Sequence, residues 1–128
     1  MANNLREQRE SQRYYFNPDE NIVGVFYIKE LDTRVTLKIA NICNGGLYFS
    51  SKRDKSINHL KNTPIFLEEI KGHSALSFTD NIKLVIRWVL DKEILQHVGF
   101  GCQFINLPEH IFKQIDDFVE SEVDHNRR

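Results

Sequence analysis

The feature that most constrains this chain is segment 82–90, where large apolar residues recur at every second position. The recurring residues are Ile82, Leu84, Ile86, Trp88 and Leu90. A period of two indicates a β-strand, because successive side chains of a strand point to opposite faces. The segment therefore predicts a strand that places Trp88 on the core side and Arg87 on the opposite face.

Other segments show the same strand pattern. Residues 22–30 are rich in Val, Ile, Phe and Tyr, and Val35, Leu37 and Ile39 alternate with more polar neighbours. Segments 64–70 and 74–79 predict further strands from weaker patterns. In segment 98–104, Gly99 and Gly101 occupy the face opposite the apolar residues. Glycines spaced in this way indicate strong curvature or a close backbone approach, as in a barrel.

After residue 105 the apolar spacing becomes helical. Asn106 and Pro108 are typical of a helix start, and an end is expected near Val123. One face of this predicted helix carries an apolar stripe, which consists of Ile111, Ile115, Phe118 and Val119. About six short strands followed by one amphipathic helix predict a mainly β fold, a small antiparallel barrel with a helix packed on it.

Length and charge limit the function classes. The 128 residues match one domain, and the net charge of -1 argues against binding long nucleic acids. The first ten residues lack the apolar core of a signal peptide, and no apolar stretch is long enough to insert into a membrane. A cytoplasmic protein is expected, with Cys43 and Cys102 as free thiols. The histidines and cysteines show no metal-site spacing, so neither a metal nor a cofactor is expected.

Residues 1–20 differ in composition from the rest of the chain. They are polar and charged, with few apolar groups to bury. We expect a flexible N-terminal arm over 1–20, a barrel with its C-terminal helix over 21–123, and a polar tail over 124–128. Such an arm becomes ordered only against something else, such as a ligand.

Two motifs carry candidate chemistry. Arg9 and Arg13 lie four residues apart in the arm, and segment 41–46 follows a predicted strand with Asn41, Gly45 and Gly46. A guanidinium group binds phosphate oxygens and the guanine edge in a bidentate way and also stacks on aromatic rings. The asparagine amide can donate to and accept from a guanine edge, and the glycines allow close backbone approach.

Each motif also has a simpler interpretation. Arg9 and Arg13 can be solvated charges paired with Glu7 and Glu10. Segment 41–46 can be a hairpin turn, because Asn and Gly are common in turns.

At these residues the chain resembles the PilZ family. Arg9 and Arg13 match the R-x-x-x-R element of its N-terminal arm. The family's D/N-x-S-x-x-G element is matched by Asn41, Cys43 and Gly46, with cysteine in place of the usual serine. The resemblance implies a six-stranded barrel that binds cyclic di-GMP. The implied ligand-binding residues are Arg9, Arg13, Asn41, Cys43, Gly45 and Gly46. A thiol is a poorer hydrogen-bond donor than a hydroxyl, so Cys43 implies a loss of ~1 kcal/mol at most.

Several functions agree with this pattern. The first is a cyclic di-GMP receptor whose arm orders on the ligand and which then signals to a downstream protein. The alternative is a PilZ-like adaptor that binds no cyclic di-GMP and acts through protein contacts alone. A small barrel that binds single-stranded nucleic acid by stacking is also considered, although the near-neutral charge argues against it. No catalytic constellation is evident, so an enzyme is not expected.

Overall fold

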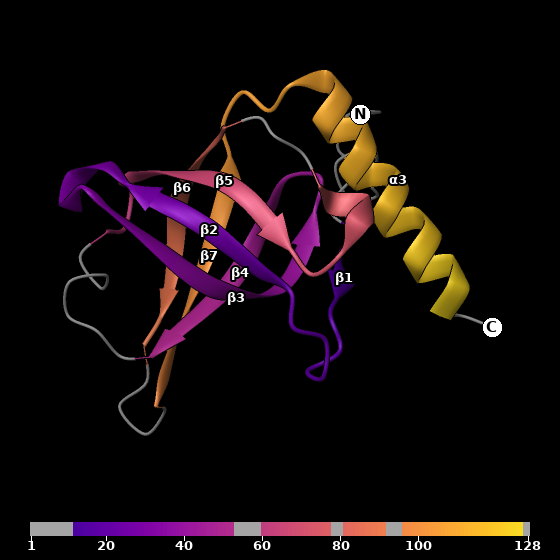
Figure 1. Cartoon of the computed structure of the whole chain (residues 1–128), viewed down its shortest axis with the longest axis horizontal. Coiled ribbons are helices and arrows are strands. Elements are labelled where there is room, and N and C mark those ends of the chain that lie inside the picture. The colour runs from indigo at the N-terminus through magenta and orange to yellow at the C-terminus, as the bar shows by residue number, and fades with distance from the viewer. Residues whose placement is uncertain (1–11, 53–59, 78–80, 92–95, 127–128) are drawn as a thin grey trace, which may run out of the picture.

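The computed structural model describes residues 12–52, 60–77, 81–91 and 96–126, and it is built around a barrel of strands with a helix beside it (Figure 1). The barrel strands are β2 (Val23–Ile28), β3 (Thr33–Cys43), β4 (Gly46–Lys52), β5 (Pro64–Lys71), β6 (Ile82–Leu90) and β7 (His97–Phe104). A two-residue strand, β1 (Tyr14–Tyr15), precedes them. Two short 3₁₀ helices, η1 (Lys29–Leu31) and η2 (Ser74–Leu76), and one helix, α3 (Glu109–Asn126), complete the order.

The strands close into a barrel. They follow the order β3-β2-β5-β6-β7-β4, and β4 pairs back onto β3. Every one of these pairs is antiparallel. Closure satisfies the backbone hydrogen bonds that open edges would leave unpaired. The predicted six-stranded antiparallel barrel with a C-terminal helix is therefore confirmed.

Aromatic rings fill the barrel, and α3 covers its outer surface at one end. Phe26, Phe49 and Phe100 are fully buried, with ring centroids 4.9 and 5.2 Å apart along the series. The helical stripe is also buried, as its spacing predicts; it consists of Ile111, Ile115, Phe118 and Val119. The helix continues to Asn126, three residues beyond the expected end. Its contacts with β1, β3 and η2 place this last helix beside the first described strand (Figure 1).

The strand predicted over 74–79 is not formed at its start. Residues Ser74–Leu76 form η2 instead, and Leu76 is fully buried. Nδ1 of His73 accepts a hydrogen bond from the backbone N–H of Ala75 at 3.2 Å, so the side chain caps a tight turn. This local cap stabilises a turn at residues where the apolar spacing suggested extended structure.

The described strand pairs show three shifts of register, and two of these β-bulges, on β3 and β6, change which side chains face outward near the pocket described below. The pairing shifts between Ile39 and Asn41 on β3, and again between Ile86 and Trp88 on β6. A bulge adds one residue to a strand and so reverses the faces of all residues after it. Trp88 is consequently 67% exposed. The prediction that Trp88 lies in the core is wrong, because the alternation does not continue through the bulge.

The described part of the N-terminal arm lies on the barrel. Tyr14 and Tyr15 pair with Ile42 and Asn41 of β3, and the N–H of Phe16 donates to the carbonyl of Ala40 at 3.0 Å. Phe16 is 8% exposed and belongs to the hydrophobic core. The arm expected over 1–20 thus divides into residues 14–16, which are packed on the barrel, and residues 1–11, which lie outside the described residues.

Candidate functional site

One row of residues crosses five neighbouring strands. Tyr15 of β1 pairs with Asn41 of β3, and Asn41 pairs with Tyr48 of β4. Tyr48 pairs with Gly101 of β7, which also pairs with Trp88 of β6. Asn41 and Trp88 each come directly after a bulge. The bulges therefore set the row of three aromatic rings and one amide that borders the candidate site.

Arg13 reaches from the arm onto this row. Its Nη1 donates to Oδ1 of Asn41, and its Nη2 donates to Sγ of Cys43 at 3.2 Å. Asn41 and Cys43 are two residues apart on β3 and share a face, so one planar guanidinium contacts both. A guanidinium has five N–H donors, so donors remain for an anion or a base edge.

These residues surround a pocket of about 380 Å³ on the barrel surface. Its lining consists of Arg13, Tyr15, Asn41, Leu47, Tyr48, Trp88, Gly101 and Cys102. The volume is within the range of small-molecule sites, and the composition of apolar walls with a few polar groups is typical of them. Partial burial raises the pKa of the Tyr48 hydroxyl, and deep burial raises that of the Cys102 thiol.

The two glycines of β7 make room for the rings. A Cβ on Gly101 would stand 2.7 Å from Cε3 of Trp88, and one on Gly99 would stand 1.6 Å from the hydroxyl oxygen of Tyr48. Both distances are too short for a side chain at these positions unless the rings move. The close backbone approach expected from the glycine spacing is therefore an approach of aromatic side chains to the bare backbone of β7.

The turn between β3 and β4 holds the other predicted site residues. Gly46 cannot carry a side chain, because a Cβ there would lie 1.9 Å from the carbonyl oxygen of Cys102. Gly45 is exposed, and its carbonyl accepts a hydrogen bond from the N–H of Phe104 at 3.0 Å. Neither glycine lines the pocket. Gly46 serves the packing of β4 on β7, and this tight contact holds the turn beside the pocket.

The predicted site residues thus have different outcomes in the structure. Arg13, Asn41 and Cys43 are in direct contact, and Gly45 and Gly46 follow them in the turn. Arg9 lies outside the described residues. The sequence prediction omitted Tyr15, Tyr48 and Trp88 from the site. The alternating Gly99 and Gly101 were the one sequence signal that pointed toward these rings.

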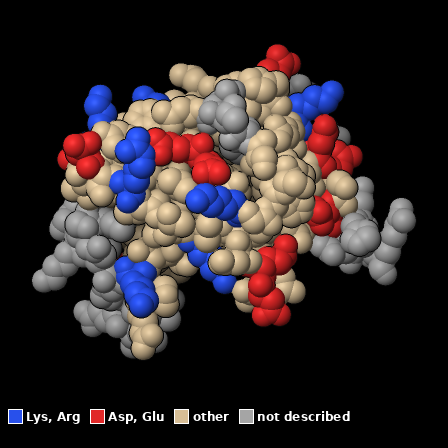
Figure 2. Space-filling model, in the orientation of Figure 1, with Lys and Arg blue, Asp and Glu red and all other residues tan. Residues whose placement is uncertain are grey.

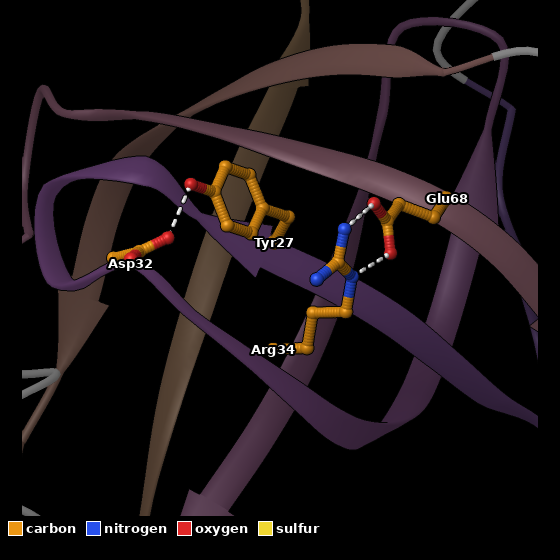
Figure 3. Close-up of polar contacts among 4 residues, drawn as sticks. All are labelled: Tyr27, Asp32, Arg34 and Glu68. Carbon is orange, nitrogen blue, oxygen red and sulfur yellow. Dashed lines mark hydrogen bonds and ion pairs between the residues drawn. The ribbon is translucent and has the colours of Figure 1, made fainter.

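A second polar cluster, drawn in Figure 3, lies on β2, β3 and β5 and in the turn before β3, and none of its residues lines the pocket. Arg34 forms a bidentate pair with Glu68 at 2.8 and 3.1 Å, and its guanidinium carbon is 5.0 Å from the ring centroid of Tyr27. The hydroxyl of Tyr27 donates to Asp32 at 2.8 Å, and this hydrogen bond raises the pKa of Tyr27. The polar groups of these four residues are hydrogen-bonded or paired with one another on an exposed part of the surface. Arg34 is therefore a suitable comparison for Arg13.

Another pocket, of about 480 Å³, is larger but less suited to a nucleotide. It is lined by Lys29, Glu30, Thr63, Pro64, Phe66 and Lys83. The described lining includes no arginine and a single aromatic ring, and neither Arg13 nor residues 41–46 belong to it. Among the described residues on the face shown in Figure 2, Lys and Arg are interspersed with Asp and Glu and form no continuous basic surface.

The described residues show neither a metal-binding cluster nor a membrane-spanning helix. No cluster of three or more His, Cys, Asp or Glu residues that could hold a metal ion occurs among them. Within the same residues, no helix has the length and apolar character needed to cross a membrane.

The barrel with its C-terminal helix has the fold of solved PilZ-type structures. The chain aligns with K. pneumonia MrkH in complex with c-di-GMP at a TM-score of 0.68 and 15% identity, covering 91% of this chain and 52% of that one. The alignment with Borreliella burgdorferi PlzA in complex with c-di-GMP has a TM-score of 0.61 and 12% identity, and it covers 99% of this chain and 59% of PlzA. The alignment with the PilZ domain of Escherichia coli YcgR with c-di-GMP has a TM-score of 0.63 and 10% identity, and it covers 90% of this chain and 91% of that domain.

The likeness is therefore one of fold. The chain spans about half the length of MrkH but nearly all of the isolated YcgR domain. No sequence model of a known protein family matches the chain, and no curated protein sequence does.

Proposed function

We propose that this protein is a cytoplasmic receptor for cyclic di-GMP that signals to a partner protein. The observation that carries the proposal is the position of Arg13, whose guanidinium is held by Asn41 and Cys43 at the mouth of an aromatic-walled pocket. Solved structures of the same fold, MrkH, PlzA and YcgR, are complexes with c-di-GMP, and this supports the choice of ligand.

The chemistry of the pocket fits a dinucleotide. The free N–H groups of Arg13 can donate to phosphate oxygens or to O6 and N7 of a guanine. The rings of Tyr15, Tyr48 and Trp88 provide flat surfaces on which bases stack, typically with about 1–3 kcal/mol per base. A net charge of -1 suits a small ligand with two phosphates better than a long polyanion.

The arm completes the proposed site. Arg9 lies four residues before Arg13, so closure of the arm over the pocket would bring a second guanidinium to the ligand. Residues 14–16 are already paired with or packed on the barrel, so this part of the arm needs no further ordering when a ligand binds. A shorter ordered segment costs less conformational entropy on binding. The newly ordered arm would then present a surface to the downstream protein.

Isothermal titration calorimetry tests this proposal. The wild-type protein and three variants, Arg9→Ala, Arg13→Ala and Arg34→Ala, are titrated with cyclic di-GMP, and the wild type also with cyclic di-AMP. We expect micromolar or tighter binding of cyclic di-GMP by the wild type and by Arg34→Ala. Loss of a charge-assisted contact should weaken binding by Arg13→Ala at least tenfold, or about 1.4 kcal/mol.

The contrary outcome is equally clear. A folded wild-type protein that gives no heat with cyclic di-GMP would overturn the receptor proposal and favour an adaptor that acts through protein contacts alone. Equal binding of cyclic di-AMP would retain a dinucleotide site but reject guanine as its preferred base.

A further inference from the structure

Helix α3 contacts the turn that carries the second motif. Nδ2 of Asn44 donates to Oδ1 of Asp116 at 2.9 Å. Asn44 lies between Cys43 and Gly45, and it is only 7% exposed. A buried amide without a partner is unfavourable, so the carboxylate of Asp116 holds this turn in place.

The same helix also contacts the arm. The ring of Phe118, two residues after Asp116, lies edge-on to Tyr14 with centroids 5.6 Å apart, and 6.2 Å from the ring of Phe16. Tyr14 directly follows Arg13, the guanidinium of the proposed ligand site. One turn of α3 therefore contacts both parts of that site.

Neither Asp116 nor Phe118 lines the pocket. Any effect of these residues on a ligand must therefore pass through the turn and the arm. We propose that Asp116 and Phe118 are positioning residues through which α3 sets the placement of Arg13 relative to Asn41 and Cys43. This inference rests on the proposed function, because it concerns the same dinucleotide site.

The proposal has a reciprocal consequence. If α3 stabilises the binding-competent arrangement, ligand binding must stabilise that placement of α3 by the same free energy, although Asp116 and Phe118 do not line the pocket. Ligand binding to the folded protein slows exchange of every amide that opens by global unfolding, so a helix that only packs on the barrel would gain no more protection than the barrel strands. Protection of α3 amides that exceeds the protection of the barrel strands therefore separates positioning from simple packing.

The test compares Asp116→Ala, Asp116→Asn and Asp117→Ala by calorimetry with cyclic di-GMP. Asp116→Ala removes the acceptor for Asn44 and should weaken binding about tenfold. Asp116→Asn keeps a side-chain oxygen at the same place, so its affinity should stay close to that of the wild type. Asp117 is the exposed neighbour on the same helix, and Asp117→Ala should leave affinity unchanged.

Hydrogen exchange read by mass spectrometry supplies the second measurement. In the wild type, cyclic di-GMP should slow exchange in peptides covering 109–126 more than in peptides from the barrel strands, and Asp116→Ala should reduce that effect. Without ligand, Asp116→Ala should speed exchange in the peptide covering 41–47. If Asp116→Ala does not fold, Phe118→Leu takes its place, and the peptide covering 12–20 becomes the reporter.

The outcomes distinguish the two proposals. A folded Asp116→Ala variant with wild-type affinity and wild-type exchange at 41–47 would overturn the positioning role. A wild-type protein that does not bind cyclic di-GMP would overturn the proposed function. In that case, the exchange of 41–47 without ligand still decides whether Asp116 holds the turn.

Discussion

Trp88 lies directly against Gly101, and this contact exists because Gly101 has no side chain. A Cβ at that position would stand 2.7 Å from Cε3 of the indole, whereas real Cβ contacts essentially never fall below 3.0 Å. The indole is 67% exposed, yet its position follows from the bulge before it and from the bare backbone beneath it. The wall of the pocket thus depends on two strands that are adjacent only in the folded barrel.

Trp88 should report ligand binding through its own fluorescence. It is the single tryptophan of the chain, so a base stacked on it should quench or shift all of the indole emission. Trp88→Ala should weaken cyclic di-GMP binding about tenfold, the order of one stacking contact, and Trp88→Phe should weaken it less. Leu90→Ala, at an exposed position on the same strand, is the matched control for calorimetry. Unchanged emission at saturating ligand would exclude stacking on Trp88.

Gly101→Ala should displace the indole without unfolding the barrel. The new methyl group collides with the ring, and an exposed side chain can move more easily than the strand. We expect an altered tryptophan emission spectrum without ligand, weaker binding of cyclic di-GMP, and a modest loss of stability of about 1–3 kcal/mol. Chemical denaturation and fluorescence spectra measure both effects. A variant with wild-type emission and affinity would show that Gly101 is not required for the pocket wall.

Cys43→Ser should preserve or improve binding. The sulfur of Cys43 accepts a hydrogen bond from Arg13 at 3.2 Å, and a hydroxyl is a stronger acceptor and donor than a thiol. The gain should not exceed about 1 kcal/mol, or roughly fivefold in affinity. Cys43→Val, which has similar bulk but no polar atom, should bind more weakly. Calorimetry of the two variants in parallel checks the order, and a tighter complex with Cys43→Val would contradict the role of Cys43 as a partner of Arg13.

Phe16→Ala should destabilise the whole domain although residue 16 lies in the expected arm. The ring is 8% exposed and contacts Tyr14 and Phe118. Removing a buried phenylalanine usually costs about 3–5 kcal/mol, and this site near the surface should fall at the lower end. Tyr15→Ala, next to it but 67% exposed, should change the free energy of unfolding by less than about 1 kcal/mol. Urea denaturation of both variants decides whether residues 14–16 belong to the cooperative fold.

Stability should fall at alkaline pH because of Cys102. Burial raises the pKa of this thiol in the folded protein above the value of about 9 expected after unfolding. Below about pH 9 the thiol is neutral in both the folded and the unfolded protein, so its titration leaves stability unchanged there. Above about pH 9 the thiol ionises only in the unfolded protein, and each further pH unit should lower the free energy of unfolding by up to about 1.4 kcal/mol. Urea denaturation between pH 7 and pH 10.5 measures this decline. Cys102→Ala should be less stable at pH 7 but less sensitive to alkaline pH, and an unchanged pH slope would rule out the thiol as its cause.

The sequence predicted much of the fold because apolar spacing reports local geometry. The alternation in 82–86 and 98–104 identified two barrel strands, and the stripe from Ile111 to Val119 identified the buried face of α3. The same reasoning failed at 74–79, where the His73 cap forms a turn. A side chain that hydrogen-bonds a nearby backbone group can override a weak apolar pattern.

For the candidate site, the sequence identified the polar contacts better than the aromatic ones. Arg13 and Asn41 were selected by motif, and their side chains are hydrogen-bonded. Trp88 was assigned to the core, because nothing in the apolar pattern of β6 marks the bulge at Arg87. Tyr48 was not selected, since an aromatic residue on a strand is ordinary core material until its partners are known.

By itself, the sequence determined the strands, the helix and the residues that can bind a phosphate or a guanine, because these follow from local spacing and side-chain chemistry. Only the tertiary structure decided which side chains of each strand point outward from the barrel. Barrel closure fixed the register of each strand pair, and the two bulges then turned Asn41 and Trp88 to the same surface. The reason is physical: an extra residue reverses every side chain after it, and that extra residue is defined by the partner strand, which the local sequence does not contain.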